Sequence, residues 1–336
     1  MQGYTRKAMA GHLDSDLKEI TGCMGSKGYF KENKLLLLQE VHSILEEKNH
    51  LNEAGEAMLG YMKIRHEYHY MQVPFPITKV QHVTTAECMS DILESQCFSA
   101  RSRKKYFEDL TFWSAQISKD DINTAFEDAY QSIQGDFSPQ FLSQYKQDIR
   151  DQFANSPAFK NFESRYGSFM FSFSLSDLLD LYETQHCGSK KPLFKYLGTD
   201  LFKKEIAHYI VIHSPDTDEF DDLQQVPRFW TDVERPVYWT EQKLYWRPES
   251  TSEKLTVLFS QYFLRKLEYE KFCVWNNLVF AFHLPEGRSL RIQREQLLEN
   301  LSACHATVTP YLGVTKNTRE EAIEIIESKK RHYEYN

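Results

Sequence analysis

The sequence predicts an α+β fold: a mixed, mostly antiparallel sheet with flanking helices and an N-terminal helical layer. Two observations lead to this prediction. Short β-prone segments alternate with capped amphipathic helices in the first half of the chain, and long β-prone runs follow one another in the second half. The chain has 336 residues, of which 41% are hydrophobic and 26% charged, so it can bury a sizeable core.

The N-terminal part, residues 1–72, is predicted to be a helical segment that packs on the rest of the chain. Apolar residues repeat at helical spacing within Lys34–Glu47 and again within Ala54–Met62. A single apolar stripe on each helix is too little to close a core of its own. Pro74 and Pro76 cannot continue a helix, so the boundary is expected there.

Residues 73–336 are predicted to form the α+β core with C-terminal helices. Three strands are each followed by a capping sequence and a helix. The strands are expected at Ile77–Thr84, Leu110–Ala115 and Tyr166–Ser172. The helices are expected to begin at Thr84–Glu87, Ser118–Asp121 and Ser174–Asp177.

The second half of the chain is richer in predicted strands. Leu193–Leu197 and Glu205–His213 flank a Gly-Thr-Asp sequence and are expected to form a hairpin. Further strands are predicted within Pro236–Trp246, Leu255–Phe259 and Phe272–Leu284, and terminal helices at Gln293–Cys304 and Thr318–Lys329. Residues 215–227 are acidic and flanked by prolines, which indicates a surface loop.

Composition excludes several classes of protein. A net charge of −8 argues against a general nucleic-acid-binding role, which needs a basic face. The longest apolar stretch near the N-terminus is Leu35–Leu38, so neither a signal peptide nor a membrane span is expected. The six cysteines are scattered without a close pair, as in reduced intracellular proteins, and the expected location is the cytoplasm or the nucleus.

Common catalytic motifs are missing from the sequence. It contains no glycine-rich phosphate loop and no nucleophile elbow. His66 and His69 have a spacing that allows metal ligation on a helix, but no third ligand cluster accompanies them. No metal site is therefore predicted.

The most specific feature is the strand–helix unit around His82. The strand ends in His82-Val-Thr84, and the following helix carries Ile92-Leu93 before Cys97-Phe98. This unit resembles the first motif of the ADP-ribosyltransferase superfamily, including its PARP-like, DarT-like and RNA 2′-phosphotransferase branches. Cys97 stands where that motif has a glycine.

Two further elements are similar to the same superfamily. Phe112 or Trp113 stands where the superfamily has its nicotinamide-stacking tyrosine. The superfamily also has a glutamate at the start of a late strand, a place that Glu205 fits. The segment after Glu270 is an alternative for this strand, but it offers Lys271 where the glutamate belongs.

The resemblance implies binding of NAD, as a substrate, or of a related nucleotide. His82 and Thr84 would bind a ribose, Phe112 or Trp113 would stack on the nicotinamide, and Glu205 with His82 would assist glycosidic cleavage. The protein would then be an ADP-ribosyltransferase or an NAD glycohydrolase, with a protein or small-molecule acceptor. The alternative is a catalytically silent module that binds a ligand or a protein, and an unrelated α+β function also stays open.

Overall fold

The computed structural model confirms the α+β class. It describes residues 17–21, 27–31, 34–36, 74–100, 109–133, 140, 158–159, 163–164, 166–202, 205–227, 237–240, 243–246, 258–259, 275–306 and 317–334. Among these residues, no helix is long and apolar enough to cross a membrane.

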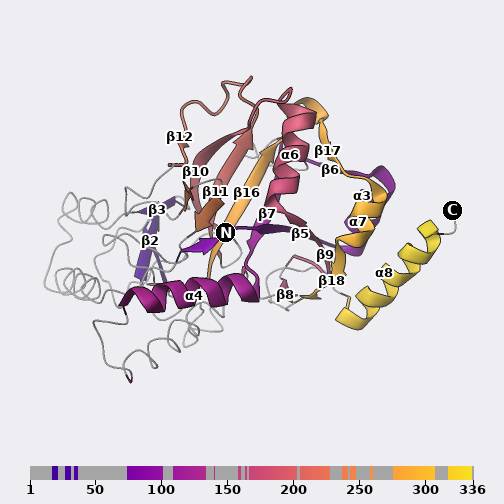
Figure 1. The fold of residues 1–336 in the computed structure, drawn as a ribbon, viewed down its shortest axis with the longest axis horizontal. Helices are drawn as coiled ribbons and strands as arrows, with labels where there is room; N and C mark the ends of the chain where they lie inside the picture. The colour runs from indigo at the N-terminus through magenta and orange to yellow at the C-terminus, as the bar shows by residue number, and fades with distance from the viewer. Residues whose placement is uncertain are drawn as a thin grey trace, which may run out of the picture.

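A twelve-stranded sheet forms the centre of the fold (Figure 1). Its order is β15-β1-β2-β3-β10-β11-β16-β7-β5-β9-β18, and β12 pairs with β10 outside this path. The strands are β1 (Leu17–Thr21), β2 (Lys27–Lys31), β3 (Lys34–Leu36), β5 (Lys79–Thr84), β7 (Leu110–Gln116), β9 (Phe169–Ser174), β10 (Leu193–Phe202), β11 (Glu205–His213), β12 (Gln224–Gln225), β15 (Leu258–Phe259), β16 (Trp275–His283) and β18 (Leu301–Ala303).

One neighbouring pair in this sheet is parallel. β11 runs parallel to β16, with Ile212 opposite Phe282, and the other strand pairings of the sheet are antiparallel in the part of the chain that the structure describes. Parallel neighbours need a crossover connection, and here the chain between residues 213 and 275 supplies it. The carboxyl ends of β11 and β16 therefore lie side by side.

Three small sheets complete the strand content of the described residues. β4 (Phe75–Pro76) joins the hairpin of β13 (Val237–Thr240) and β14 (Lys243–Trp246). β6 (Cys97–Ser99) pairs with β17 (Ser289–Arg291), which follows the short 3-10 helix Pro285–Gly287. β8 (Glu163–Ser164) pairs with β19 (His305–Ala306).

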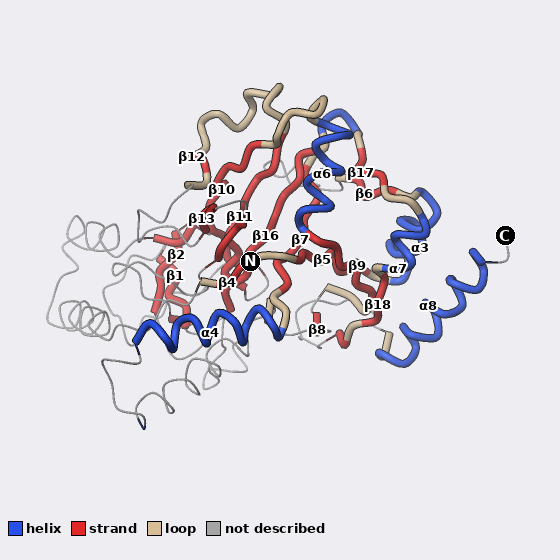
Figure 2. The backbone as a smooth tube through the Cα atoms, in the orientation of Figure 1, coloured by secondary structure: helices blue, strands red, loops and turns tan. Residues whose placement is uncertain are grey.

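Five helices of the described residues flank these sheets (Figure 2). They are α3 (Ala86–Ser95), α4 (Lys119–Ile133), α6 (Leu175–His186), α7 (Arg294–Glu299) and α8 (Arg319–Glu334). Reciprocal bonds between Ser118 and Asp121 cap α4, and the backbone N–H of Asp177 donates to the Ser174 hydroxyl at the start of α6. Both capping predictions are confirmed, whereas the N-cap of α3 is Thr85 instead of Thr84.

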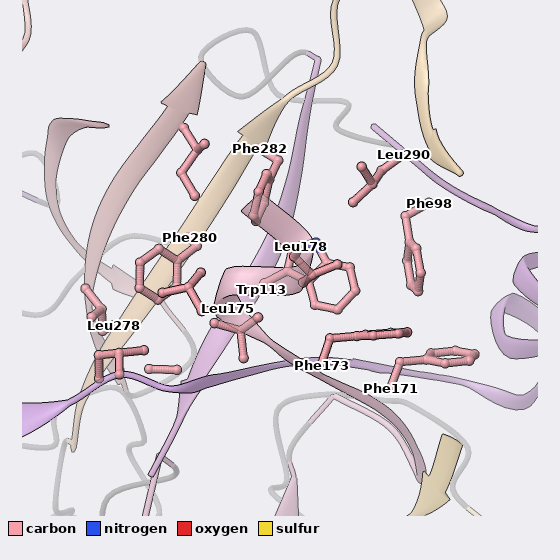
Figure 3. Close-up of a cluster of buried hydrophobic side chains, with 14 of the residues drawn as sticks. Phe98, Trp113, Phe171, Phe173, Leu175, Leu178, Leu278, Phe280, Phe282 and Leu290 are labelled. Carbon is pink, nitrogen blue, oxygen red and sulfur yellow. The ribbon is translucent and has the colours of Figure 1, made fainter. Parts of the chain in front are cut away.

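The main core lies between one face of the sheet and helices α3 and α6 (Figure 3). Trp113 of β7, Phe171 of β9 and Phe280 of β16 are fully buried on this face. Leu175 and Leu178 of α6 pack against the same cluster, which also contains the predicted inward residues of α3, Met89, Ile92 and Leu93. Burial of such large rings is the main stabilising contribution in a core of this kind.

Three parts of the chain differ from the prediction. Residues 17–21, 27–31 and 34–36 are strands, so the helix expected to start at Lys34 does not start there; the rest of that helix and Ala54–Met62 lie outside the described residues. Tyr29 and Phe30 favour a strand, and pairing with β3 satisfies their backbone groups.

The helix expected over Gln293–Cys304 ends at Glu299, because residues 301–303 pair with β9 as β18. Residues 198–200, expected as a turn, are paired strand residues of β10; the register shifts between Tyr196 and Gly198, and the pairing of the two strands continues to Phe202 and Glu205.

Candidate functional site

The candidate site starts at the carboxyl end of β5. This strand is central, with β7 on one side and β9 on the other. One residue separates its end at Thr84 from helix α3, and the Thr85 hydroxyl accepts a hydrogen bond from the Cys88 backbone N–H at 3.5 Å. The strand–helix junction expected around His82 is therefore present.

The His82 ring is held by one hydrogen bond to the neighbouring strand. Its Nδ1 lies 2.9 Å from the backbone oxygen of Phe112, and a carbonyl oxygen only accepts hydrogen bonds. Nδ1 therefore carries the proton, and in the neutral ring Nε2 is an acceptor. Among the described residues, no hydrogen bond to Nε2 is found.

Aromatic rings surround His82. The ring centroids of Phe98 and Trp113 are 5.1 and 5.3 Å from that of His82, and Phe171 is its cross-strand neighbour on β9. This apolar setting lowers the pKa of His82 below its ordinary value, because burial disfavours the imidazolium, and the bond to the Phe112 carbonyl opposes the shift only in part. His82 is thus neutral at pH 7, although part of the residue remains exposed.

Thr84 is buried beside a glycine whose lack of a side chain is necessary. A Cβ atom on Gly167 would lie 1.9 Å from the Thr84 carbonyl oxygen and 2.4 Å from its carbon. The segment that precedes β9 therefore packs directly on the backbone at the end of β5. This contact keeps Thr84, which is 8% exposed, in a fixed position next to His82.

The two aromatic candidates lie on opposite faces of β7. Trp113 faces the main core, where the rings of His82, Phe98 and Phe173 contact it and its exposure is 0%. Phe112 is half-buried on the other face, with its ring centroid 6.1 Å from that of Tyr209. Trp113 is therefore next to His82, but its ring is covered by protein. Phe112 contacts His82 only through its backbone carbonyl, which accepts the hydrogen bond from Nδ1.

Glu205 lies at a different level of the sheet. Its backbone opens β11 and pairs with Trp275 and Phe202. Phe280 of β16 pairs with Trp113 of β7 on one side and with Ile210 of β11 on the other. Ile210 is therefore the residue of β11 at the level of Trp113. At about 3.3 Å per residue and about 4.8 Å per strand, this places the backbone of Glu205 roughly 20 Å from Trp113 and from His82. The alternative at Glu270 and Lys271, like His66 and His69, is outside the described residues.

The structure thus brings together His82, Thr84 and Trp113 and leaves Glu205 apart. A neutral imidazole with a free Nε2 can accept a hydrogen bond from a ligand hydroxyl or amide. Glycosidic cleavage needs in addition an anion beside the developing positive charge, within contact distance of the same sugar. No carboxylate bonded to His82 is found in the part of the chain that the structure describes.

A second group of polar residues was not singled out by the sequence analysis. His213 and His283 end the two parallel strands β11 and β16, and both are buried. The available signal was that two apolar, β-prone runs each end in a histidine. It has no meaning until the two strands are known to be parallel neighbours.

Fold and site together define an α+β protein with a mixed sheet and a strand-end histidine in an aromatic layer. Comparison with known proteins adds no relative: no family model matches the chain, and neither a curated protein nor a solved structure matches it significantly. Groups of at least three histidine, cysteine or acidic side chains with the geometry of a metal site are not found among the described residues.

Proposed function

We propose that this chain is a catalytically silent binding module, which holds a ligand or a protein partner without cleaving NAD. The observation that carries the proposal is the sheet register, which keeps Glu205 roughly 20 Å from His82 on strand spacings. A carboxylate at that distance cannot stabilise an oxocarbenium-like transition state at the ribose bound by His82.

The environment of His82 also supports a role in binding. A strongly desolvated imidazole whose Nδ1–H is bonded to a backbone carbonyl is a poor proton donor at pH 7, so it is unsuited to general acid catalysis. The same ring, fixed by three aromatic neighbours, presents Nε2 as an oriented acceptor. The lowered pKa also makes Nε2 a weak base, so this arrangement favours recognition of a ligand over proton transfer.

Binding of NAD or a related nucleotide is a second candidate function. It is favoured by the position of His82, which is mostly buried but keeps some exposure at the end of a central strand, where a ribose hydroxyl can donate to Nε2. The covered ring of Trp113 leaves no face for a nicotinamide, so the nucleotide would be held through its sugar.

The test combines calorimetric titration of NAD⁺ with an assay of nicotinamide release. We expect no release above that of NAD⁺ in buffer, and the same result for Glu205→Gln. Release that depends on Glu205 would overturn the silent module.

For the second candidate, His82→Gln should weaken NAD⁺ binding about tenfold through loss of one hydrogen bond, whereas His305→Gln, at an exposed position, should not. No heat at millimolar NAD⁺ would exclude nucleotide binding and leave a different ligand or a protein partner.

A cytoplasmic location is part of this proposal. The four cysteines that the described residues contain, Cys88, Cys97, Cys187 and Cys304, are free thiols, as expected in a reducing compartment.

A further inference from the structure

His213 and His283 lie side by side at the carboxyl ends of the parallel strands β11 and β16. Ile212 is opposite Phe282, so the next residue of each strand is a histidine. Their exposed fractions are 0% and 2%. Two histidines buried at one end of a sheet, far from His82 along the sequence, are not explained by the proposed binding function.

The segment that follows β11 is a loop that leads from the end of this strand to β12 (Figure 2). Phe220 of this segment is buried, and its ring centroid is 5.2 Å from that of His213 and 4.9 Å from that of His283. Backbone bonds from Asp221 N–H to the Asp218 oxygen and from Leu223 N–H to the Phe220 oxygen shape residues 214–223 into successive turns. We name residues 214–223 the acidic segment.

Ion pairs attach the acidic segment to the surrounding structure. Lys190, which follows α6, pairs with Asp216, and Lys195 of β10 lies 3.5 Å from Asp221. Both carboxylates are more than half exposed, so each pair is worth little by itself. The principal attachment of the segment is therefore the buried side chain of Phe220, which packs against the two histidines and against Leu110, Val211 and Ala281.

The polar contacts of the two buried imidazoles differ. Nδ1 of His213 donates to the Ser214 backbone oxygen at 2.8 Å, which makes the buried Nε2 an acceptor with no hydrogen-bond partner among the described residues. Nε2 of His283 lies 3.1 Å from a carboxylate oxygen of Glu219, but out of line for a hydrogen bond. An imidazolium at His213 would bury a donor without an acceptor, and one at His283 would face the Glu219 carboxylate without an aligned hydrogen bond.

Charged groups face the two rings from every neighbouring element. Glu219 and Asp221 of the acidic segment and Asp109 before β7 favour protonation. Lys195 of β10 and the mutual approach of the histidines oppose it, as does His186 of α6, which stacks on Tyr182. Burial is the largest influence and lowers the pKa of His213 and of His283 below the ordinary value.

We propose that the acidic segment is a pH-dependent latch: it is closed over the ends of β11 and β16 when His213 and His283 are neutral, and it opens when they take up protons. Two adjacent imidazolium rings repel each other and need water, which the closed segment excludes. Opening moves Phe220 away from the two histidines and admits water to their rings. The strands of the sheet remain paired.

The direction of the pH dependence follows from linkage. Histidines whose pKa is lowered in the closed state bind protons more readily in the open state. The closed state is therefore fully favoured above the pKa of an exposed histidine and loses its advantage as the pH falls below it. Each pKa unit of difference at one histidine changes the ratio of closed to open molecules about tenfold.

Hydrogen exchange of the full-length protein, followed segment by segment, tests the latch. Amides of Thr217, Asp221 and Leu223 are hydrogen-bonded in the closed segment and report on it directly. After correction for the intrinsic pH dependence of exchange, we expect their protection to fall at least about tenfold between pH 7.5 and pH 5. Protection in β5 and β7 should change much less. Equal changes throughout the chain, or none in the acidic segment, would overturn the proposal.

Two kinds of variant separate the latch from general instability. In Glu219→Gln, a change at an exposed side chain, the closed state loses the anion that favours protonation of His283. The pKa of His283 in the closed state then lies further below that in the open state, so the segment should open more readily in acid and lose protection at higher pH than in the wild type. In the double variant His213→Gln, His283→Gln the protection of the segment should no longer depend on pH. The matched control His305→Gln should behave as the wild type. Unchanged pH dependence in both Glu219→Gln and the double variant would contradict the role of these histidines.

Discussion

The hydroxyl of Tyr182 donates a 2.7 Å hydrogen bond to the backbone oxygen of His283, which joins helix α6 to the end of strand β16. Tyr182 is 1% exposed, and its ring packs on Phe282 and stacks on His186. Burial raises the pKa of Tyr182 well above its ordinary value, so the hydroxyl remains a donor throughout the physiological range.

Replacement of Tyr182 by Phe is expected to lower the free energy of unfolding by about 1–2 kcal/mol, because the buried carbonyl of His283 loses its donor while the ring packing remains. Urea unfolding measures the change. Tyr333→Phe is the matched control, since Tyr333 lies half-buried on α8 and keeps its contact with Arg294 through the ring. A loss as large in the control as in Tyr182→Phe would refute the assigned role of the bond.

Gly167→Ala is expected to cost more than about 3 kcal/mol, because the new Cβ would overlap the backbone of Thr84, which cannot move without separating β5 from β9. The comparison is Gly188→Ala, where the backbone has a positive φ of 55° but nothing lies within 4 Å of the new atom. That control should cost about 1 kcal/mol from backbone strain alone. Similar thermal stabilities of the two variants would contradict the close packing at Thr84.

The start of helix α8 gives a third prediction. The Thr318 hydroxyl accepts from the Glu321 backbone N–H at 3.1 Å, and the Glu321 carboxylate accepts from the Thr318 N–H at 2.8 Å. Thr318→Ala should destabilise the helix by about 1 kcal/mol, seen as roughly fivefold faster hydrogen exchange in its first turns. Thr318→Ser keeps the hydroxyl and should restore slow exchange. If the amides of the first turns of α8 exchange equally fast in Thr318→Ser and Thr318→Ala, the cap does not stabilise α8.

Much of the fold was predictable because its signals are local. Ser118 with Asp121 and Thr318 with Glu321 mark helix starts within four residues of sequence, and both pairs bond as expected. Strand β3 was not predictable in this way. Lys34–Leu36 continues into a sequence with helical periodicity, and its strand conformation depends on pairing with β2 and with Asp200 of β10, which is distant along the chain.

The candidate site was predictable only in part for the same reason. The strand–helix junction at His82 and the strand beginning at Glu205 are both present, since each follows from its own segment. Their separation depends on the order and register of β11, β16, β7 and β5, which no local pattern encodes. The contact of His213 and His283 with Phe220 likewise exists only because β11 and β16 are parallel neighbours.

A fourth prediction concerns the acid sensitivity of the whole sheet, through His208 of β11. His208 is 8% exposed, and its Nδ1 lies 3.2 Å from the hydroxyl of Tyr196 on β10. Burial lowers the pKa of His208 from an ordinary 6.5 to about 4. The folded state therefore favours the neutral ring, and the resulting stability is complete above pH 6.5 and is lost as the pH falls toward 4.

This loss should amount to about 3 kcal/mol, since each pKa unit corresponds to about 1.4 kcal/mol. Urea unfolding of wild type and His208→Gln at a series of pH values between 7 and 4 measures it. The variant is expected to be less stable than the wild type at pH 7, but its stability should fall less steeply with acid, because glutamine takes up no proton. His305→Gln, at an exposed position, should keep the wild-type slope. If His208→Gln and the wild type lose stability in parallel over the whole range, the acid sensitivity of the sheet does not come from His208. The dependence of stability on pH that remains in His208→Gln should decrease further when His213 and His283 are also replaced. Those two rings are buried at the carboxyl end of the β11–β16 pair to which His208 belongs.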